Sequence, residues 1–428
     1  MLLRDPVLLR TLLNAAGRLR CRTAPRNRST ERVRICRYLN DAAAAANISA
    51  DFELAWAWRE WGTARAEEVG LRERANVPVI LDLLDHLDIP ITWATVGHLF
   101  LESCADDNGG PNHPGMPRPP TNRRWDGDWY KHDPGTSAVK HPAWYCPDLI
   151  RSIQQAKAVH EIGSHSFSHI DFSRACSNET LVVAEILECQ RSMGRFGIQP
   201  RTLVYPFNIM GHQYLPILAR HGFTVVRHRD PRFVLSCPER DSSGVYKIYE
   251  SMGLRESRRY HQPTKASILI ELAVRNGLCF HFWFHPSEVT GAACTTMREI
   301  LQHLASRRDK GEVWVATMKD LVSYSEARER MRIRSATAGR VESLRIECPI
   351  DRQRFGDPEV TLCVLSSRTP LSITATASNR PDQPTMLSFR FDAESGLTTF
   401  NVRSSTSDVE IRWPDGHATG TRRGRERI

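Results

Sequence analysis

Two histidines four residues apart, His165 and His169, occur in a Gly/Ser-rich segment that spans residues 163–169. Imidazoles at positions i and i+4 can bind one metal ion when the segment is helical or tightly turned. His281 and His285 have the same spacing but lie in a strand-like stretch, where such positions are about 13 Å apart. We therefore expect His165 and His169 to share a metal ion; surface or helix-capping histidines are the alternative.

Two carboxylates, Asp51 and Glu53, stand at the end of a strand predicted over residues 47–54. Side chains at positions i and i+2 of a strand point the same way, so both can reach one site. One carboxylate can then bind a metal ion while the other acts as a general base. The alternative is a helix start, because acidic residues are common in a first helical turn.

Two further groups end predicted strands. His285 follows a strand, and in parallel α/β folds the ligand site lies beyond the carboxyl ends of the strands. We therefore expect His285 to be a general acid, with a core histidine as the alternative. The strand 202–205 ends in the turn Tyr205, Pro206 and Phe207, whose backbone N–H groups can face a ligand.

Strands and helices alternate over residues 47–327, which indicates a parallel α/β sheet or barrel. Residues 104–147 lack periodicity and are rich in Gly, Pro, Asn, Asp and Trp, which is typical of a functional or a disordered loop. Short alternating strands after about residue 345 predict a small all-β domain. The expected division is a basic amphipathic leader at 1–46, the α/β domain at 47–327, the β domain at 345–416 and a basic tail at 417–428.

The composition excludes several classes of protein. Of the 428 residues, 41% are hydrophobic and 25% charged, so the chain is neither wholly disordered nor fibrous. The net charge is +9, divided as +7 over residues 1–46, −2 over 47–327 and +4 over 328–428. A nucleic-acid partner is not expected, because the large middle block is not basic. No apolar run reaches the ~18 residues of a transmembrane helix.

The cysteines and the leader bear on location. The 11 cysteines form no C-x-x-C pair and are scattered along a long chain, which favours reduced thiols and a cytoplasmic protein. The leader has no signal-peptide pattern. Its leucines and arginines are compatible with a helix on a membrane surface, a solvated tail, a docking helix or an organelle transit peptide.

The four motifs together resemble a known family. Their order and spacing are similar, over about residues 47–325, to those of the polysaccharide deacetylases, the NodB-homology or carbohydrate esterase family 4 group. The motifs are Asp51/Glu53, His165-x-x-x-His169, Tyr205-Pro206-Phe207 and Trp283-Phe284-His285-Pro286. The resemblance implies a distorted (β/α) barrel, a divalent metal ion (usually zinc) and hydrolysis of an N-acetyl group on an amino sugar.

The resemblance also implies roles for single residues. His165 and His169 would be metal ligands, and His285 would be the general acid. The family usually has two adjacent aspartates, the first a base and the second a ligand. Here Phe52 separates the pair, so Asp51 is assigned as base and Glu53 as ligand, with an exchange of roles left open.

One position departs from the family pattern. The third motif usually has an arginine two residues before its proline, where this chain has Val204. An arginine that orients the base must therefore come from elsewhere, with Arg201 and Arg227 as candidates. Trp56, Trp58 and Trp61 offer flat faces for sugar stacking, with core packing as the alternative. The expected substrate-binding residues are Tyr205, Pro206, Phe207, Trp56, Trp283 and Arg227.

The sequence thus predicts a metal-dependent hydrolase that removes N-acetyl groups from an amino sugar in a polysaccharide or its precursor, for surface polysaccharide (exopolysaccharide) biosynthesis or modification. The expected partner is an N-acetylated sugar or oligosaccharide, with membrane contact through the leader as a further expectation. Two alternatives stay open. One is a related metal-assisted amidohydrolase on a small amide, and the other a non-catalytic carbohydrate-binding relative, which the missing arginine makes plausible.

Overall fold

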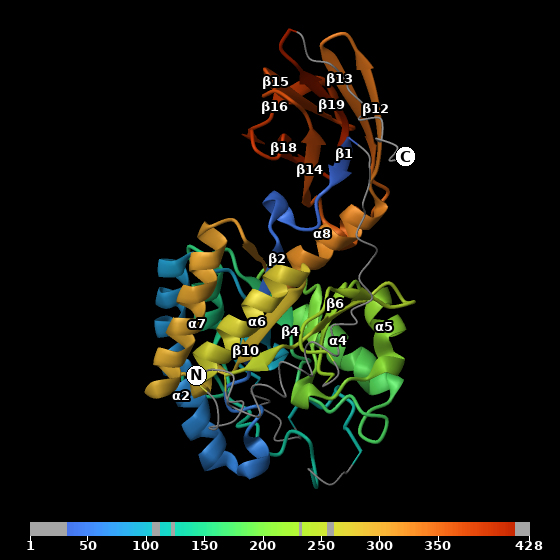
Figure 1. Ribbon diagram of the computed structural model, residues 1–428. Helices are drawn as coiled ribbons and strands as arrows, with labels where there is room; N and C mark the ends of the chain where they lie inside the picture. The colour runs from blue at the N-terminus through green and yellow to red at the C-terminus, as the bar shows by residue number, and fades with distance from the viewer. Residues whose placement is uncertain (1–31, 105–111, 121–124, 231–232, 255–260, 416–428) are drawn as a thin grey trace. The chain divides into compact units, whose positions relative to one another are not determined.

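The computed structural model describes residues 32–104, 112–120, 125–230, 233–254 and 261–415 (Figure 1). The described residues form two compact units, the first made of residues 43–322 and the second of residues 32–42 and 323–415. Most of the leader expected at 1–46, and all of the tail expected at 417–428, lie outside the described residues. None of the helices in the described ranges combines the length and hydropathy needed to cross a bilayer.

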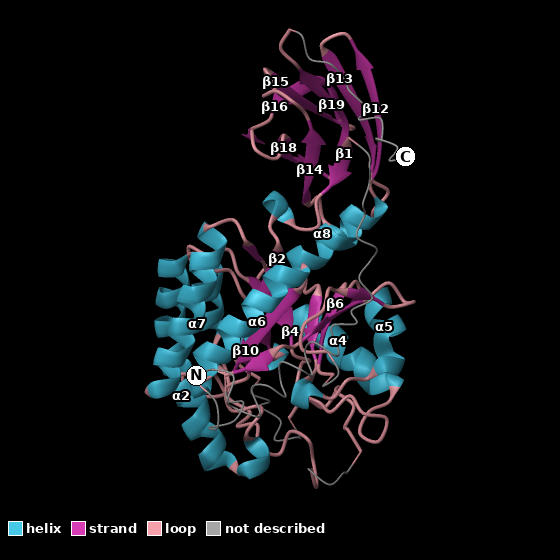
Figure 2. Ribbon diagram, viewed as in Figure 1, coloured by secondary structure: helices cyan, strands magenta, loops and turns pink. Residues whose placement is uncertain are grey.

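The first unit is built on one curled, predominantly parallel sheet with helices around it, which confirms the expected α/β class (Figure 2). The strand order is β7-β8-β6-β5-β4-β3-β2-β10-β9, and β11 also pairs with β2. The strands are β2 (Ala44–Phe52), β3 (Thr92–Thr95), β4 (Glu161–Ser164), β5 (Thr202–Val204), β6 (Val225–His228), β7 (Glu239–Arg240), β8 (Tyr246–Tyr249), β9 (Met252–Gly253), β10 (Cys279–Phe284) and β11 (Val313–Val315). The helices are α2 (Thr63–Leu87), α3 (Pro147–Gln155), α4 (Glu179–Gly194), α5 (Leu215–Arg220), α6 (Gln262–Asn276), α7 (Ala292–Asp309) and α8 (Met318–Arg330), the last of which continues into the second unit.

Two elements differ from the sequence pattern. Helix α2 begins at Thr63, although its apolar periodicity is clear only from about residue 75. Its first half buries Gly70 and Glu73, which do not read as an apolar face; a Cβ at Gly70 would lie 2.9 Å from the backbone oxygen of Ala143. Residues 161–164 read as a loop because of their polar and glycine content, yet they form the fully buried strand β4 between β3 and β5.

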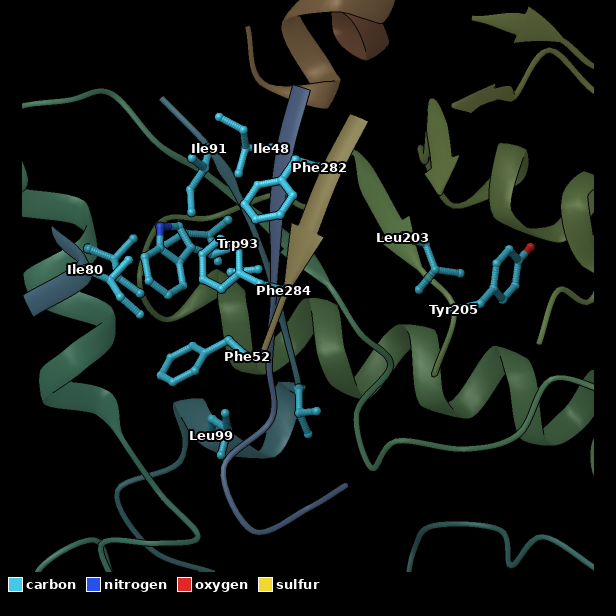
Figure 3. Packing of buried hydrophobic residues seen from close by; sticks show 14 of the residues in the cluster. Ile48, Phe52, Ile80, Ile91, Trp93, Leu99, Leu203, Tyr205, Phe282 and Phe284 are labelled. Atoms are coloured by element: carbon cyan, nitrogen blue, oxygen red, sulfur yellow. The ribbon is translucent and has the colours of Figure 1, made fainter. Parts of the chain in front are cut away.

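The apolar core of the first unit covers one face of the sheet and leaves the polar side chains of β2 on the other face. Alternate residues of β2 and β10 pack with β3 and α2 into a buried apolar cluster, in which the rings of Phe52 and Trp93 are 5.7 Å apart (Figure 3). The labelled members from these elements are Ile48, Phe52, Ile80, Trp93, Phe282 and Phe284. Because side chains alternate along a strand, Ser49 and Asp51 lie on the opposite face of β2.

The second unit consists of antiparallel sheets, as expected for a small C-terminal all-β region. Their orders are β1-β14-β18-β17 and β12-β13-β19-β15-β16. The strands are β1 (Val33–Ile35), β12 (Arg332–Ala338), β13 (Val341–Glu347), β14 (Glu359–Leu365), β15 (Ser372–Ala377), β16 (Arg380–Met386), β17 (Phe389–Asp392), β18 (Leu397–Arg403) and β19 (Thr406–Arg412). The unit therefore includes β12 and a strand from near the N-terminus, both outside the range 345–416.

Candidate functional site

The candidate site forms where the parallel strands end. Asp51 is the second-last residue of strand β2, and Glu53 directly follows the strand. Both carboxylates are buried. The two carboxylates are two residues apart, and side chains at positions i and i+2 of an extended chain point to the same face. His285 follows β10, which pairs with β2 in parallel register, so its side chain reaches the same edge. The ligand atoms of Asp51, Glu53 and His285 lie within 4.8 Å of one another.

Glu53 joins the two histidines of the Gly/Ser segment. Its Oε1 lies 2.8 Å from Nε2 of His165 and 3.0 Å from Nε2 of His169. Nδ1 of His165 lies 2.8 Å from the backbone oxygen of Val204, and donation there leaves a lone pair on Nε2. Among the described residues, Glu53 Oε2 is buried and has no hydrogen-bond partner. Two imidazoles and a carboxylate, one oxygen of it unsatisfied, are a donor set that fits a divalent metal ion such as zinc.

The histidines converge because the backbone after β4 turns sharply rather than forming a helix. Ser166 and His169 both have φ of 59°, in the left-handed region that costs non-glycine residues energy. The turn is held by a buried network in which the hydroxyl of Ser168 donates to Glu185 Oε1 at 2.6 Å and the backbone N–H of Ser168 donates to Oε2 at 2.8 Å. Packing thus stabilises a strained turn that the two histidines need to face one point.

Asp51 forms a buried, bidentate ion pair with Arg227 from β6. The guanidinium nitrogens lie 2.5 and 2.6 Å from the two carboxylate oxygens. Arg227 also donates to Asn208 Oδ1 at 2.9 Å, and its guanidinium lies 4.8 Å from the ring centre of Trp283. Arg201, the other candidate, donates to the backbone oxygen of Gly222 at 3.1 Å. The structure therefore brings Arg227 to the proposed base.

His285 lies between two carboxylates. Its Nδ1 is 2.9 Å from Glu288 Oε1, and its Nε2 is 3.6 Å from Glu53 Oε2. Burial favours the neutral imidazole, but the charges of Glu53 and Glu288 outweigh it and raise the pKa of His285 to about 10. The imidazole is therefore protonated at neutral pH, the state that a general acid needs.

Burial and neighbouring groups also shift the pKa values of Glu53, His169 and Glu73. Burial opposes ionisation of Glu53, but the positive charge of His285 and the hydrogen bonds with His165 and His169 hold its pKa well below the usual range. Burial lowers the pKa of His169 to about 4, which keeps its imidazole available as a ligand. Glu73, whose Oε1 accepts from the backbone N–H of Glu53 at 2.9 Å, has its pKa raised to about 8 by burial and by the charge of Glu53. Nothing in the local pattern of α2 marks Glu73 as part of the site.

A small pocket opens beside His169. Phe207 packs against His169 with ring centres 4.5 Å apart, and its φ of 58° marks another strained turn. The pocket is lined by Trp56, Ala57, Arg59, Glu60, Trp125, Trp129, His169, Asp171 and Phe207. Trp56 and Phe207 are among the residues expected from the sequence, whereas Arg59, Trp125 and Trp129 are not. Trp125 and Trp129 lie in the aperiodic segment, which has no pattern that marks them.

Arg59 organises the aromatic wall of this pocket. Its guanidinium lies 4.6 Å from the ring centre of Trp56 and 4.3 Å from that of Trp129, and it donates to the backbone oxygen of Ser168 at 2.8 Å. Its burial lowers the pKa to about 10, so the guanidinium stays charged at neutral pH. The flat indole faces are therefore held in place by a cation.

The remaining expected residues have different surroundings. Tyr205 is buried, with its ring 5.0 Å from that of Phe172, so its side chain belongs to the core rather than to the pocket lining. Trp283 lies over Arg227, and its ring centre is 5.4 Å from that of His285. The ring centre of Trp58 lies 6.0 Å from that of His285, and Trp58 is half-buried, whereas Trp61 beside it is 57% exposed and offers an open face.

Comparisons with solved structures return weak likenesses. A polysaccharide deacetylase described as putative, from Mycobacterium smegmatis, is 18% identical, covers 69% of this chain and 94% of its own, and has a TM-score of 0.49. A peptidoglycan deacetylase from Bacillus subtilis is 12% identical over 67% of this chain and 93% of its own, with a TM-score of 0.36. A family 4 carbohydrate esterase from Streptomyces lividans, in complex with acetate, is 13% identical over 64% and 92%, with a TM-score of 0.33. No curated protein matches the chain.

Residues 68–226 match the family model for polysaccharide deacetylases. The match includes His165, His169 and the turn at Tyr205, whereas Asp51 and His285 lie outside it. Over residues 68–226 this chain is therefore similar to the polysaccharide deacetylase family, whose members are hydrolases that act on carbon–nitrogen bonds.

Proposed function

We propose that this protein is a metal-dependent hydrolase that removes N-acetyl groups from an amino sugar, in a polysaccharide or a precursor used to build a surface polysaccharide. One observation carries the proposal: a His-His-carboxylate donor set lies beside a carboxylate paired with a buried arginine and beside a protonated imidazole. Glu53, His165 and His169 are the donor set, Asp51 is the carboxylate and His285 the imidazole.

Glu53, His165 and His169 would hold the metal ion. When bound at such a set, a divalent ion lowers the pKa of water and polarises an amide carbonyl. The hydrogen bond from His165 to Val204 fixes the ring orientation, which is a common support for a metal-binding histidine. The protein's own contribution here is therefore a rigid, buried donor set.

Asp51 would accept the proton of the attacking water. Its bidentate pair with Arg227 fixes the plane of the carboxylate. Each carboxylate oxygen has a second lone pair beyond the one that faces Arg227, so the pair leaves acceptor capacity for a proton. This arrangement argues against the non-catalytic alternative, since an arginine at the base is present after all.

His285 would protonate the departing amine. Glu288 holds its Nδ1, so Nε2 faces the side of the site where Glu53 lies. General acid assistance of this kind contributes about 10²–10⁴-fold to rate. An amine leaving without a proton would be a far poorer leaving group than the protonated one.

The pocket supports a carbohydrate as substrate. Indole rings suit the apolar faces of sugar rings, and Trp56, Trp125 and Trp129 line the pocket beside His169, with Trp56 and Trp129 largely buried against Arg59. A sugar ring bound in this pocket would lie beside His169, one of the residues that would hold the metal ion. A surface-polysaccharide intermediate is our proposal for the source of that sugar.

The test is acetate release from N-acetylated oligosaccharides and sugar nucleotides, with and without a chelator. We expect activity that the chelator removes and a divalent metal ion restores. Asp51→Asn and His285→Gln should each lower it by about 100-fold or more. His86→Gln, a substitution of an exposed histidine on α2, is the matched control and should leave activity unchanged.

The outcomes separate the alternatives. Turnover of small amides such as ureides or cyclic imides, without release of acetate from any sugar, would assign the chain to the amidohydrolase alternative. Sugar binding without hydrolysis, unaffected by Asp51→Asn, would make it a binding protein. Deacetylation that survives both catalytic substitutions would overturn the assignment of residues.

A further inference from the structure

A second cluster of potential metal ligands lies in the aperiodic segment, apart from the donor set of Glu53. It contains His98 in the 3₁₀ turn after β3 (Gly97–Phe100), with Cys104, His113 and Asp133 from the segment that follows. One ligand atom from each of the four residues lies within 4.8 Å of the others. His98 and Asp133 are buried, and the other two are half-buried.

The separations in this cluster approach those around a tetrahedral ion. Nε2 of His98 and Nε2 of His113 are 3.1 Å apart, and they lie 3.2 and 2.8 Å from Asp133 Oδ2. Cys104 Sγ lies 3.4 Å from the same oxygen. Zinc bonds of about 2.0–2.3 Å in tetrahedral geometry put neighbouring ligand atoms about 3.3–3.7 Å apart. Shifts of a few tenths of an ångström would therefore admit an ion.

The orientation of His98 favours a cation at this point. Its Nδ1 is 3.4 Å from the backbone oxygen of Trp144, and donation there leaves the lone pair of Nε2 directed at Asp133 Oδ2. One metal ion can join this lone pair and the carboxylate oxygen 3.2 Å away, and a backbone oxygen on the far nitrogen is the usual support for a metal-binding histidine.

We propose that His98, Cys104, His113 and Asp133 form a second metal site, structural rather than catalytic, that takes a zinc-like divalent ion. Two imidazoles, a thiolate and a carboxylate give four protein ligands, and a closed set of four is typical of structural zinc. The site goes beyond the proposed deacetylase chemistry, because it contains none of the residues assigned to that reaction.

The role of this site would be to hold the segment that forms one wall of the pocket. His98 packs against Trp56 with ring centres 4.3 Å apart, and His113 packs against Tyr130 at 4.8 Å. Trp56 lines the pocket beside His169, as does Trp129, the residue before Tyr130. The described part of the segment has no helix or strand between Cys104 and α3, so an ion that joins three of its residues to His98 would add a fixed point to irregular structure.

The thiol makes the site distinguishable from the catalytic one. Burial and the charge of Asp133 raise the pKa of the Cys104 thiol to about 12, so the metal must displace its proton on binding. Glu53, His165 and His169 include no cysteine. A thiolate-to-cobalt charge-transfer band in the near ultraviolet therefore distinguishes the second site from the catalytic one when Co²⁺ replaces zinc.

The experiment loads the metal-free full-length protein with Co²⁺ and measures bound ions per chain and the thiolate band. We expect two ions and the band. Cys104→Ser should remove the band and one ion, whereas His169→Ala should remove one ion and keep the band. Cys36→Ser with Cys363→Ser is the matched control, since these thiols form another cluster with Asp41, and it should keep the band.

Two results would overturn this metal site, and a third would uphold it while contradicting the proposed deacetylase centre. Loading of the unsubstituted protein without a thiolate band would show a hydrogen-bonded network and no metal site, and this measurement requires no variant to fold. A band that survives Cys104→Ser would place the ion elsewhere. A band with a single ion that His169→Ala leaves in place would uphold the second site while removing the metal from the proposed deacetylase centre.

Discussion

Arg227 binds both carboxylate oxygens of Asp51, at 2.5 and 2.6 Å, across a sequence separation of 176 residues. The family pattern has an arginine at the position that Val204 occupies, and Val204 instead accepts a hydrogen bond from His165 through its backbone oxygen. Strand β6 lies beside β5 in the sheet, so an arginine at its end reaches the base from the neighbouring strand. Arg227 on β6 thus supplies the positive charge that the family pattern places at the position of Val204.

This pair predicts the effect of Arg227→Met. Removal of one partner from a buried ion pair costs about 3–5 kcal/mol of stability and leaves a charged carboxylate without its orienting group. We expect kcat/KM for acetate release to fall by about 100-fold or more. Arg201→Met is the control, because that guanidinium donates to Gly222 and not to Asp51. Equal effects of the two substitutions on kcat/KM, measured where both proteins are folded, would show that Arg227 does not serve the base.

Glu53→Gln and Asp51→Asn separate the ligand from the base. Glu53 contacts both histidines, so its amide variant should lose the catalytic metal ion and all measurable activity. Asp51 pairs with Arg227, so its amide variant should retain the metal ion while activity falls. Metal analysis of the two purified variants decides between them. Loss of metal in Asp51→Asn alone would mean that the two carboxylates have exchanged roles.

The pKa of His285 predicts a pH dependence. Burial would lower this pKa, but Glu53 and Glu288 raise it to about 10, so the acid form is present at lower pH and is lost as the pH rises through that value. Glu288→Gln removes one raising charge and should move the alkaline limb of kcat/KM toward lower pH. A pH–rate profile of both proteins measures the shift. An unchanged alkaline limb would show that it does not report on His285.

His160 predicts how stability depends on pH. Burial lowers its pKa to about 4, and its Nδ1 accepts a hydrogen bond from the backbone N–H of Ile91 at 3.2 Å. The pKa is lower in the folded chain than in the unfolded chain, so this stability is present above about pH 6.5 and is lost toward about pH 4.

The measurement compares the unfolding free energy of wild type and His160→Gln at about pH 7 and about pH 5. The wild type should lose on the order of 1 kcal/mol more than the variant between these conditions. His86→Gln, at an exposed position, should behave like the wild type. If the unfolding free energies of wild type and His160→Gln depend on pH in the same way, protonation of His160 does not destabilise the folded protein.

Local patterns carried the sequence-based part of this picture. Alternation along a strand was enough to expect Asp51 and Glu53 on one face, because that relationship spans two residues and needs no partner. The spacing of His165 and His169 and the alternation of strands and helices likewise predicted a shared histidine site and an α/β fold. The family resemblance added a proposed role for each of these residues.

Only the tertiary structure brought Arg227 to Asp51, Glu73 behind Glu53 and the indole wall beside His169. These contacts join residues far apart in the chain, and no local periodicity records which distant strand or loop will lie alongside. The aperiodic segment shows this most clearly, since Cys104, His113 and Asp133 read singly as loop residues. Their meeting at His98 depends on packing, which is a property of the whole fold and not of any short stretch of sequence.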